Sequence, residues 1–163
     1  MSFTMFGSVL PRRYLAVLMA ASFGLTLALN PISAPPAQAA SVDAVRAVVA
    51  VRALRVTAAQ AGIPYLWGGT TRRGFDCSGL IQYAYAQVGK KLPRTTTLQF
   101  RATARVTRGY QRLGDLIFFQ TGTNIDHMGI YAGNGYIWHA TRTGGNVKLS
   151  KIWTTRFLVT RVR

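Results

Sequence analysis

The chain divides into a first part patterned for helices and a second part patterned for short strands. The clearest helical stretch lies between Asp76 and Gly89, where apolar residues recur at spacings of three and four and form one stripe. The stripe consists of Cys77, Leu80, Ile81, Ala84, Tyr85 and Val88. Asp76 is a favourable N-cap, and Gly89 is a favourable residue just beyond a helix end. The pattern predicts a helix that turns its Cys77 side toward the core.

Two further helices are predicted, one on each side of this one. The first begins at Ser41, with Asp43 in its first turn, and runs to about Ala61, where Gly62 ends it. The second is capped by a threonine at position 96 or 97 and stops at Gly109. Apolar residues occupy nearly every face of the first helix, so its orientation on the core is left open.

After residue 109 the apolar pattern changes to short runs bounded by turn residues. Strands are predicted at 116–119, 128–132, 136–140, 147–149 and 157–162. The pair Asn134-Gly135 between the second and third runs is a strong hairpin signal. Helices followed by an antiparallel sheet indicate an α+β fold.

The first 39 residues have the features of a secretory signal peptide. Arg12 and Arg13 form a basic start, residues 15–29 are apolar and uncharged, and Ala37-Gln38-Ala39 is a small-x-small cleavage site. A retained membrane anchor is the alternative, but the apolar run is shorter than the roughly 20 residues that span a bilayer. The arginine pair leaves both general and twin-arginine export open. We expect cleavage after Ala39, an N-terminal helix over 40–62 and one domain over 63–163.

The composition adds a strong positive charge. The formal net charge is +16, and it falls to +14 when Arg12 and Arg13 leave with the signal segment. Such a charge bears on partners rather than on the fold. An exported basic protein is expected in the periplasm or cell wall, near polyanions. Nothing in the sequence resembles a motif that reads nucleic acid, and no membrane contact is expected after cleavage.

Four of the positively charged residues recur at helical spacing. They are Arg101, Arg105, Arg108 and Arg112. Like charges four positions apart destabilise an isolated helix by a few tenths of a kcal/mol, and an anionic partner would offset this. Binding to phosphate-rich wall polymers and a merely solvated face are both left open.

The chain contains one cysteine, Cys77, and two histidines, His127 and His139. A single thiol cannot form an internal disulfide, and one Cys with two His lacks the paired spacing of a structural zinc site. One interpretation is an inert core thiol, because free cysteine is among the most buried residue types. Another is a zinc ion held by the three residues. The third, which we favour, is a nucleophile with an imidazole base and neither metal nor cofactor.

The favoured interpretation assigns a role to each residue. At the start of its helix, the thiolate of Cys77 gains from the positive end of the helix dipole. His127 acts as general base and then acid, and His139 orients His127 through its other ring nitrogen. The Cys77 backbone N–H and the Tyr65 hydroxyl are candidate oxyanion donors. Asp126 is a poor orienter, because on a strand it points away from its neighbour His127. The histidines are expected on the sheet face that the Cys77 helix covers.

The hairpin between the histidines tests this interpretation. A three-residue loop over 133–135 pairs position 129 with His139, so that His127 lies diagonally next to His139 on one face. A two-residue loop at Asn134-Gly135 puts the two imidazoles on opposite faces instead. The chemistry therefore requires an odd loop or a bulge.

Six stretches of the chain resemble, in order, the NlpC-type cell-wall peptidases. They are Pro-Tyr-Leu-Trp-Gly-Gly-Thr (64–70), Gly-Phe-Asp-Cys-Ser-Gly-Leu (74–80), Leu-Pro-Arg-Thr (92–95), Gly-Asp-Leu-Ile-Phe-Phe (114–119), Asp-His-Met-Gly-Ile-Tyr (126–131) and Trp-His-Ala (138–140). A single stretch would be weak, but six in order are specific.

The resemblance implies a papain-like, circularly permuted fold with helices packed on a central antiparallel sheet. It implies hydrolysis of peptidoglycan stem peptides, usually between D-glutamate and meso-diaminopimelate or lysine. The nucleophile, base and third polar residue fall at Cys77, His127 and His139. The resemblance also suggests that Tyr65, Asp76 and Ser78 line the acceptor pocket, with Asp76 facing a substrate amino group. Leu113 stands where the family often has proline.

The prediction is therefore a secreted cysteine endopeptidase that acts on peptidoglycan stem peptides through a thioester acyl-enzyme. Two alternatives belong to other classes. One is a non-catalytic wall-binding domain of the same fold, and the other is a related Cys-His amidase of the CHAP kind or an acyltransferase. Trp67 and Trp138 are expected to be packing residues, and the alternative is that one of them forms a wall of the substrate groove.

Overall fold

The structure is a computed structural model, and it describes residues 37–163. Nearly all of the predicted signal peptide lies outside the described residues, so its cleavage stays a prediction. The helices and strands follow in this order: α1 (Ala37–Ala58), β1 (Thr70–Thr71), β2 (Gly74–Phe75), α2 (Cys77–Ala86), α3 (Thr96–Arg101), β3 (Ala104–Val106), β4 (Leu116–Thr121), β5 (Asn124–Gly133), β6 (Tyr136–Ala140), β7 (Val147–Lys151) and β8 (Phe157–Arg161).

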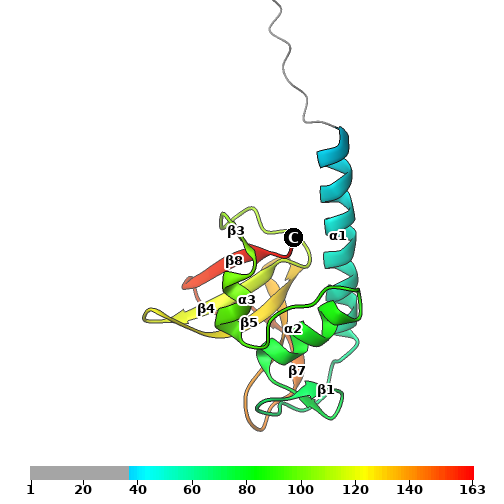
Figure 1. Ribbon diagram of the computed structural model, residues 1–163. Helices are drawn as coiled ribbons and strands as arrows, with labels where there is room; N and C mark the ends of the chain where they lie inside the picture. Colours follow the sequence, from blue (N-terminus) through cyan, green and yellow to red (C-terminus); the bar gives the residue numbers. More distant parts are fainter. Residues whose placement is uncertain (1–36) are drawn as a thin grey trace, which may run out of the picture. The chain divides into compact units, whose positions relative to one another are not determined.

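Six of the strands form one antiparallel sheet in the order β3-β8-β4-β5-β6-β7 (Figure 1). The five predicted strands are all present, with their ends moved by a few residues. Strand β3 and the small β1–β2 hairpin were not predicted. The helices pack on this antiparallel sheet, so the predicted α+β class is confirmed.

The core lies mainly between the sheet and helices α1 and α2. It contains Ala53 of α1, Ile81 and Tyr85 of α2, and Leu116, Phe118, Met128 and Ile130 of the sheet, all fully buried. Burying a side chain of Leu, Ile, Phe or Met size stabilises the fold by about 1.5–3 kcal/mol. This shared cluster therefore holds the start of α2 at a defined place over the sheet. A second cluster, with Ile117, Phe119, Ile137 and Val159, is buried on the opposite face.

Helix α2 begins and ends as its local sequence indicates. The Asp76 side chain accepts a hydrogen bond from the Gly79 N–H at 2.7 Å, as an N-cap does. Beyond the helix, Gly89 has a φ of +79°, and the Lys90 N–H bonds back to the Tyr85 carbonyl at 2.9 Å. The predicted helix, its cap and its closing glycine are confirmed.

Helix α1 begins earlier than predicted. The start at Ser41 is wrong, because the helix already includes Ala37 and the residues after it. Alanine and glutamine are strong helix formers, and they extend the helix past the expected cap. At its other end the helix stops at Ala58, and a turn leads to Gly62 with a φ of +83°. Within residues 37–163, no helix is both long and apolar enough to cross a bilayer.

The predicted helical row of arginines is wrong. Helix α3 ends at Arg101, and Arg105 lies on strand β3, which pairs with β8. The segment 103–107 is rich in β-branched residues, which favour a strand once a partner edge is available. The Arg105 guanidinium lies 3.3 Å from the centre of the Phe100 ring, whereas Arg108 donates to the Thr155 carbonyl at 2.6 Å.

Candidate active site

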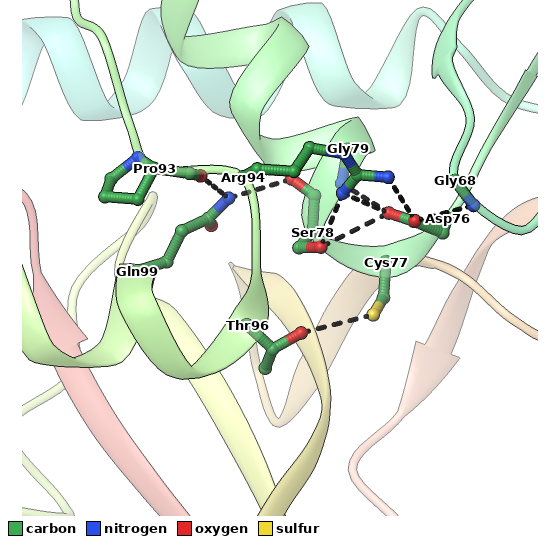
Figure 2. A network of polar contacts seen from close by, with 9 residues as sticks. All are labelled: Gly68, Asp76, Cys77, Ser78, Gly79, Pro93, Arg94, Thr96 and Gln99. Carbon is green, nitrogen blue, oxygen red and sulfur yellow. Dashed lines mark hydrogen bonds and ion pairs between the residues drawn. The ribbon is translucent and has the colours of Figure 1, made fainter.

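Asp76 and Arg94 form an ion pair at the start of α2 (Figure 2). Nη1 of Arg94 donates to Asp76 Oδ1 and to Ser78 Oγ, each at 3.0 Å, and the Gly68 N–H donates to Asp76 Oδ2 at 3.0 Å. Burial alone would raise the pKa of Asp76, but hydrogen bonds from Arg94 and the Gly79 N–H outweigh it and lower that pKa. The charged carboxylate thus ties the glycine loop and the segment before α3 to the helix.

The glycine loop lies directly against the first turn of α2. The Gly69 carbonyl accepts a hydrogen bond from the Asp76 N–H at 3.1 Å. A Cβ atom on Gly79 would lie 2.0 Å from that same carbonyl oxygen, far inside contact distance. Only glycine allows this approach, and the approach brings Trp67 and Cys77 to one cleft.

The thiol of Cys77 is mostly buried and hydrogen-bonded. Its Sγ atom lies 3.6 Å from the Thr96 hydroxyl (Figure 2). Burial is the largest influence on this thiol and raises its pKa, and the charge of Asp76 acts in the same direction. Hydrogen bonds from Thr96 and from the backbone of Met128 and Ser78 lower the pKa less than burial raises it. Burial and the charge of Asp76 therefore oppose the thiolate that the start of a helix favours.

The hairpin between β5 and β6 combines a two-residue turn with a bulge. Asn134 and Gly135 have φ values of +51° and +76°, as a tight two-residue turn requires. The register then shifts between Tyr131 and Gly133, and further along Ile130 pairs with Trp138. Continued by one pair, this register sets position 129 opposite position 139. The bulge therefore reverses the effect of the short turn, and the two histidines share one face.

The two imidazoles lie in hydrogen-bonding contact. His127 Nε2 is 2.7 Å from His139 Nδ1. Burial lowers the pKa of His127 to about 4, although Asp126 acts in the other direction. Burial also lowers the pKa of His139 to about 4, and the neighbouring titratable ring of His127 and the charge of Lys148 act in the same direction. Both rings are thus neutral at neutral pH, and a neutral imidazole can accept a proton.

Two residues that the sequence interpretation missed complete the surroundings of this pair. His139 Nε2 lies 2.9 Å from the Ser150 hydroxyl. The indole of Trp153 packs against both imidazoles, with ring centres 5.9 Å from His127 and 5.4 Å from His139. Trp153 also stacks on Phe119 at 4.1 Å. Both residues come after the loop that follows β6, and the length of this loop does not reveal the register of β7 with β6. Only the alternation of side chains along β7 indicated on which face Ser150 lies.

The histidines lie on a different face of the sheet from the one expected. His127 is the cross-strand partner of Phe119, which belongs to the cluster on the face away from α2. Its neighbour Met128 points to the α2 side, where Cys77 packs. The expectation that α2 covers the histidine face is therefore wrong. Cys77 and His127 instead both line one cleft that opens beside β5.

This cleft has a volume of about 630 Å³, and Tyr65, Trp67, Arg94 and Arg142 are among its other lining residues. Trp67 is 85% exposed, so the prediction that it packs in the core is wrong. Trp138 does pack against the buried clusters. A second cavity of about 370 Å³ lies between α1 and the loop before β4, and it contains none of the predicted catalytic or substrate-binding residues.

The residues predicted to bind substrate all border the cleft, but they differ in how far they are exposed to it. Tyr65 lines the cleft, and burial together with the charges of Cys77 and Asp76 raises its pKa. Asp76 and Ser78 also border the cleft, but they are only 8% and 5% exposed and bind each other and Arg94. His139 is 5% exposed and lies behind His127. Among residues 37–163, no three His, Cys, Asp or Glu side chains are grouped to hold a metal ion.

Arg94 belongs to the stretch Leu-Pro-Arg-Thr (92–95), and its ion pair with Asp76 was not predicted. A signal for this pairing was present, because the chain has only four acidic residues and a buried carboxylate at a helix start needs a counter-charge. Thr96 was considered only as a helix cap. Its contact with the sulfur follows from the packing of α3 beside α2, which no local pattern announces.

Comparison with known proteins gives one consistent result. The NlpC/P60 family model matches residues 62–162. The chain is 43% identical over 100 residues to the murein DD-endopeptidase MepH of Escherichia coli (strain K12), covering 57% of this chain and 36% of that protein. It is 44% identical over 87 residues to the bifunctional muramidase/DL-endopeptidase CwlT of Bacillus subtilis (strain 168), covering 51% and 26%. It thus spans well under two thirds of either relative.

Solved structures agree with this match. The peptidoglycan hydrolase RipB from Mycobacterium tuberculosis matches with a TM-score of 0.66 and 33% identity, covering 79% of this chain and 72% of that one. The NlpC/p60 domain of the peptidoglycan hydrolase SagA matches with a TM-score of 0.64 and 29% identity, covering 70% and 98%. The predicted papain-like fold is thereby confirmed.

Proposed function

Because the chain belongs to the NlpC/P60 family, we propose that it is a secreted cysteine endopeptidase that hydrolyses peptidoglycan stem peptides. One observation carries the proposal: the only thiol of the chain and His127 come from distant segments and line one cleft, and the second imidazole, His139, is in hydrogen-bonding contact with His127. The relatives named above act on peptidoglycan or murein, which supports the substrate class. The secreted location rests on the signal-like first 39 residues.

The proposed reaction begins with a neutral thiol and a neutral imidazole. Cys77 Sγ attacks the peptide carbonyl carbon while His127 takes the thiol proton, and the carbonyl oxygen becomes an oxyanion. The Cys77 N–H and the Tyr65 hydroxyl are the proposed donors to that oxyanion. His127 then gives its proton to the leaving amine, which leaves a thioester on Cys77. Water, deprotonated by His127, attacks the thioester and releases the carboxylic acid and the free thiol.

The raised pKa of Cys77 and the lowered pKa values of both histidines fit this order of events. A thiol that is protonated at rest needs a base at the moment of attack. His127 can provide that base because it is unprotonated at neutral pH. His139, bonded to the other ring nitrogen, is proposed to hold the imidazole in position.

Substrate recognition is proposed to involve Tyr65, Asp76 and Ser78, as the family resemblance implies. Asp76 keeps its negative charge, since its pKa is lowered, and a charged carboxylate can attract the amino group of a stem peptide. Its oxygens are already bonded to Arg94, Gly68 and Gly79, so the attraction would act through charge more than through a new hydrogen bond. The proposed scissile bond joins D-glutamate to the diamino acid.

The test is mass analysis of products from defined muropeptides. A disaccharide tetrapeptide with meso-diaminopimelate at position three should yield a disaccharide dipeptide and a free dipeptide, with one water added. An amidase would release the intact peptide from the sugar, and an acyltransferase would form a new amide bond. Cleavage of a cross-linked dimer at the bridge alone would change the bond but keep the enzyme class. If no substrate is cleaved although the protein is bound to it, the catalytic proposal is wrong and a wall-binding domain takes its place.

We further propose that the arginines Arg101, Arg105, Arg108 and Arg112 bind anionic wall polymers, although they do not share a helix. Three of the four acidic residues already pair with arginines outside this set, so little negative charge offsets it. Retention on purified wall material should fall steeply between about 50 and 300 mM salt, since exposed charges are screened. Replacing the four arginines by glutamine should remove this salt dependence. Salt-independent retention of the unaltered protein would show that the set is only a solvated surface.

A further inference from the structure

The imidazole contact continues beyond His139 to a third polar group. His127 Nε2 lies 2.7 Å from His139 Nδ1, and His139 Nε2 lies 2.9 Å from Ser150 Oγ. Ser150 is half-buried on β7, where its cross-strand partner is Ile137, two positions before His139. The three side chains therefore form one line of hydrogen bonds that leads from the cleft to the edge strand β7.

The proposed function determines which ring nitrogen of each histidine carries the proton. For His127 to receive the thiol proton at Nδ1, its neutral ring must carry its own proton at Nε2. That Nε2–H can only donate to His139 if His139 Nδ1 is unprotonated. The proton of the neutral His139 ring must then lie at Nε2, where it needs an acceptor. The Ser150 oxygen occupies that place.

We propose that Ser150 is a positioning residue: by accepting the Nε2–H of His139, its hydroxyl holds both imidazoles in the tautomer in which His127 offers a free Nδ1 to the thiol. The inference rests on the proposed function for its catalytic meaning. A serine hydroxyl can also donate, so the opposite arrangement, with both rings protonated at Nδ1, competes. In that arrangement His127 has no lone pair for the thiol, and the reaction stops.

Removing the hydroxyl takes away the acceptor without removing either ring. In Ser150→Ala, the Nε2–H of His139 loses its partner, and the inactive tautomer becomes more populated. We expect kcat to fall by about 10- to 100-fold with KM changed by less than about twofold, because substrate binding does not involve Ser150. Ser150→Thr restores an oxygen at the same place on a strand and should recover kcat to within about threefold.

A matched control separates positioning from general loss of stability. Thr160 on β8 is fully buried, and its hydroxyl lies 2.7 Å from that of Thr103, in a contact that involves neither histidine. Thr160→Val also removes one internal hydroxyl hydrogen bond. It should lower the unfolding midpoint while leaving kcat within about twofold. Equal losses of kcat in Thr160→Val and Ser150→Ala would reduce Ser150 to a structural residue.

A second measurement does not depend on hydrolysis. The chain has only two histidines, so long-range proton–nitrogen correlation on nitrogen-15 histidine resolves both rings at neutral pH. We expect both rings to be protonated at Nε2 in the unaltered protein and in Ser150→Thr, and a mixture of tautomers in Ser150→Ala. Protonation of His139 at Nδ1 in the unaltered protein, or an unchanged spectrum in Ser150→Ala, overturns the inference. If the unaltered protein cleaves nothing, the proposed function fails, and the spectra still decide the role of Ser150.

Discussion

Replacing Cys77 by alanine should lower the rate of muropeptide cleavage by at least about 10⁴-fold. No other thiol exists in the chain, so no second nucleophile of this kind can form a thioester. The fold should tolerate the change, because the sulfur lies at the margin of the main core cluster and its one side-chain hydrogen bond, to Thr96, is long. The measurement is the rate of dipeptide release, followed by mass analysis, at equal concentrations of folded protein.

The control for this variant is its unfolding curve, which should stay within about 1 kcal/mol of that of the unaltered protein. Binding to the muropeptide should persist, since the residues proposed to recognise substrate are unchanged. A folded Cys77→Ala variant that still releases the dipeptide at more than a few per cent of the normal rate would rule out covalent catalysis by this thiol. It would also remove the reason for assigning roles to the two imidazoles.

The parts of the fold that depend on neighbouring residues were predictable from the sequence. Helix α2 followed from Asp76, Gly89 and the apolar stripe between them, because caps and stripes act within a few residues. The turn at Asn134 and Gly135 followed from the positive φ that these residues accept. These local features also gave the place of Cys77 at the first turn of a helix.

The parts that depend on pairing between distant segments were not predictable. Residues 104–106 looked helical because Arg105 lies at helical spacing from Arg101 and Arg108, but they pair with β8, whose edge exists only once the sheet has formed. The bulge between Tyr131 and Gly133 carries no residue signature, yet it decides on which face His139 lies. Ser150 reaches His139 only through the register of β6 with β7.

The electrostatic state of the site was the least predictable property. A helix start favours a thiolate, and that effect can be inferred from Asp76 and Cys77 alone. Burial depends on the packing of α3 and β5 around the sulfur. It acts against the thiolate and raises the pKa of the Cys77 thiol. On the other face of the sheet, burial of the two imidazoles, against which Trp153 packs, lowers the pKa values of His127 and His139.

Acid should destabilise this protein through the two histidines. Their pKa values are about 4 in the folded protein and about 6.5 when unfolded, so between these values the unfolded chain binds more protons. The stability from this difference is fully present above pH 6.5 and is lost as the pH falls toward 4. Each proton taken up corresponds to a slope of about 1.4 kcal/mol per pH unit. We expect the free energy of unfolding to fall by on the order of 5 kcal/mol for the pair between pH 7 and 4.5.

Urea unfolding at half-unit steps over this range measures the slope directly. The control is a double variant, His127→Ala with His139→Ala, whose slope should be nearly flat, because Asp76 has a pKa below its ordinary value and titrates at lower pH. The comparison uses slopes, so a lower absolute stability of the double variant does not affect it. A slope that is absent from the unaltered protein, or unchanged in the double variant, would mean that the imidazoles titrate normally. In that case His127 would be largely protonated at mildly acidic pH, and cleavage should fade below about pH 6.5 instead of persisting toward pH 5.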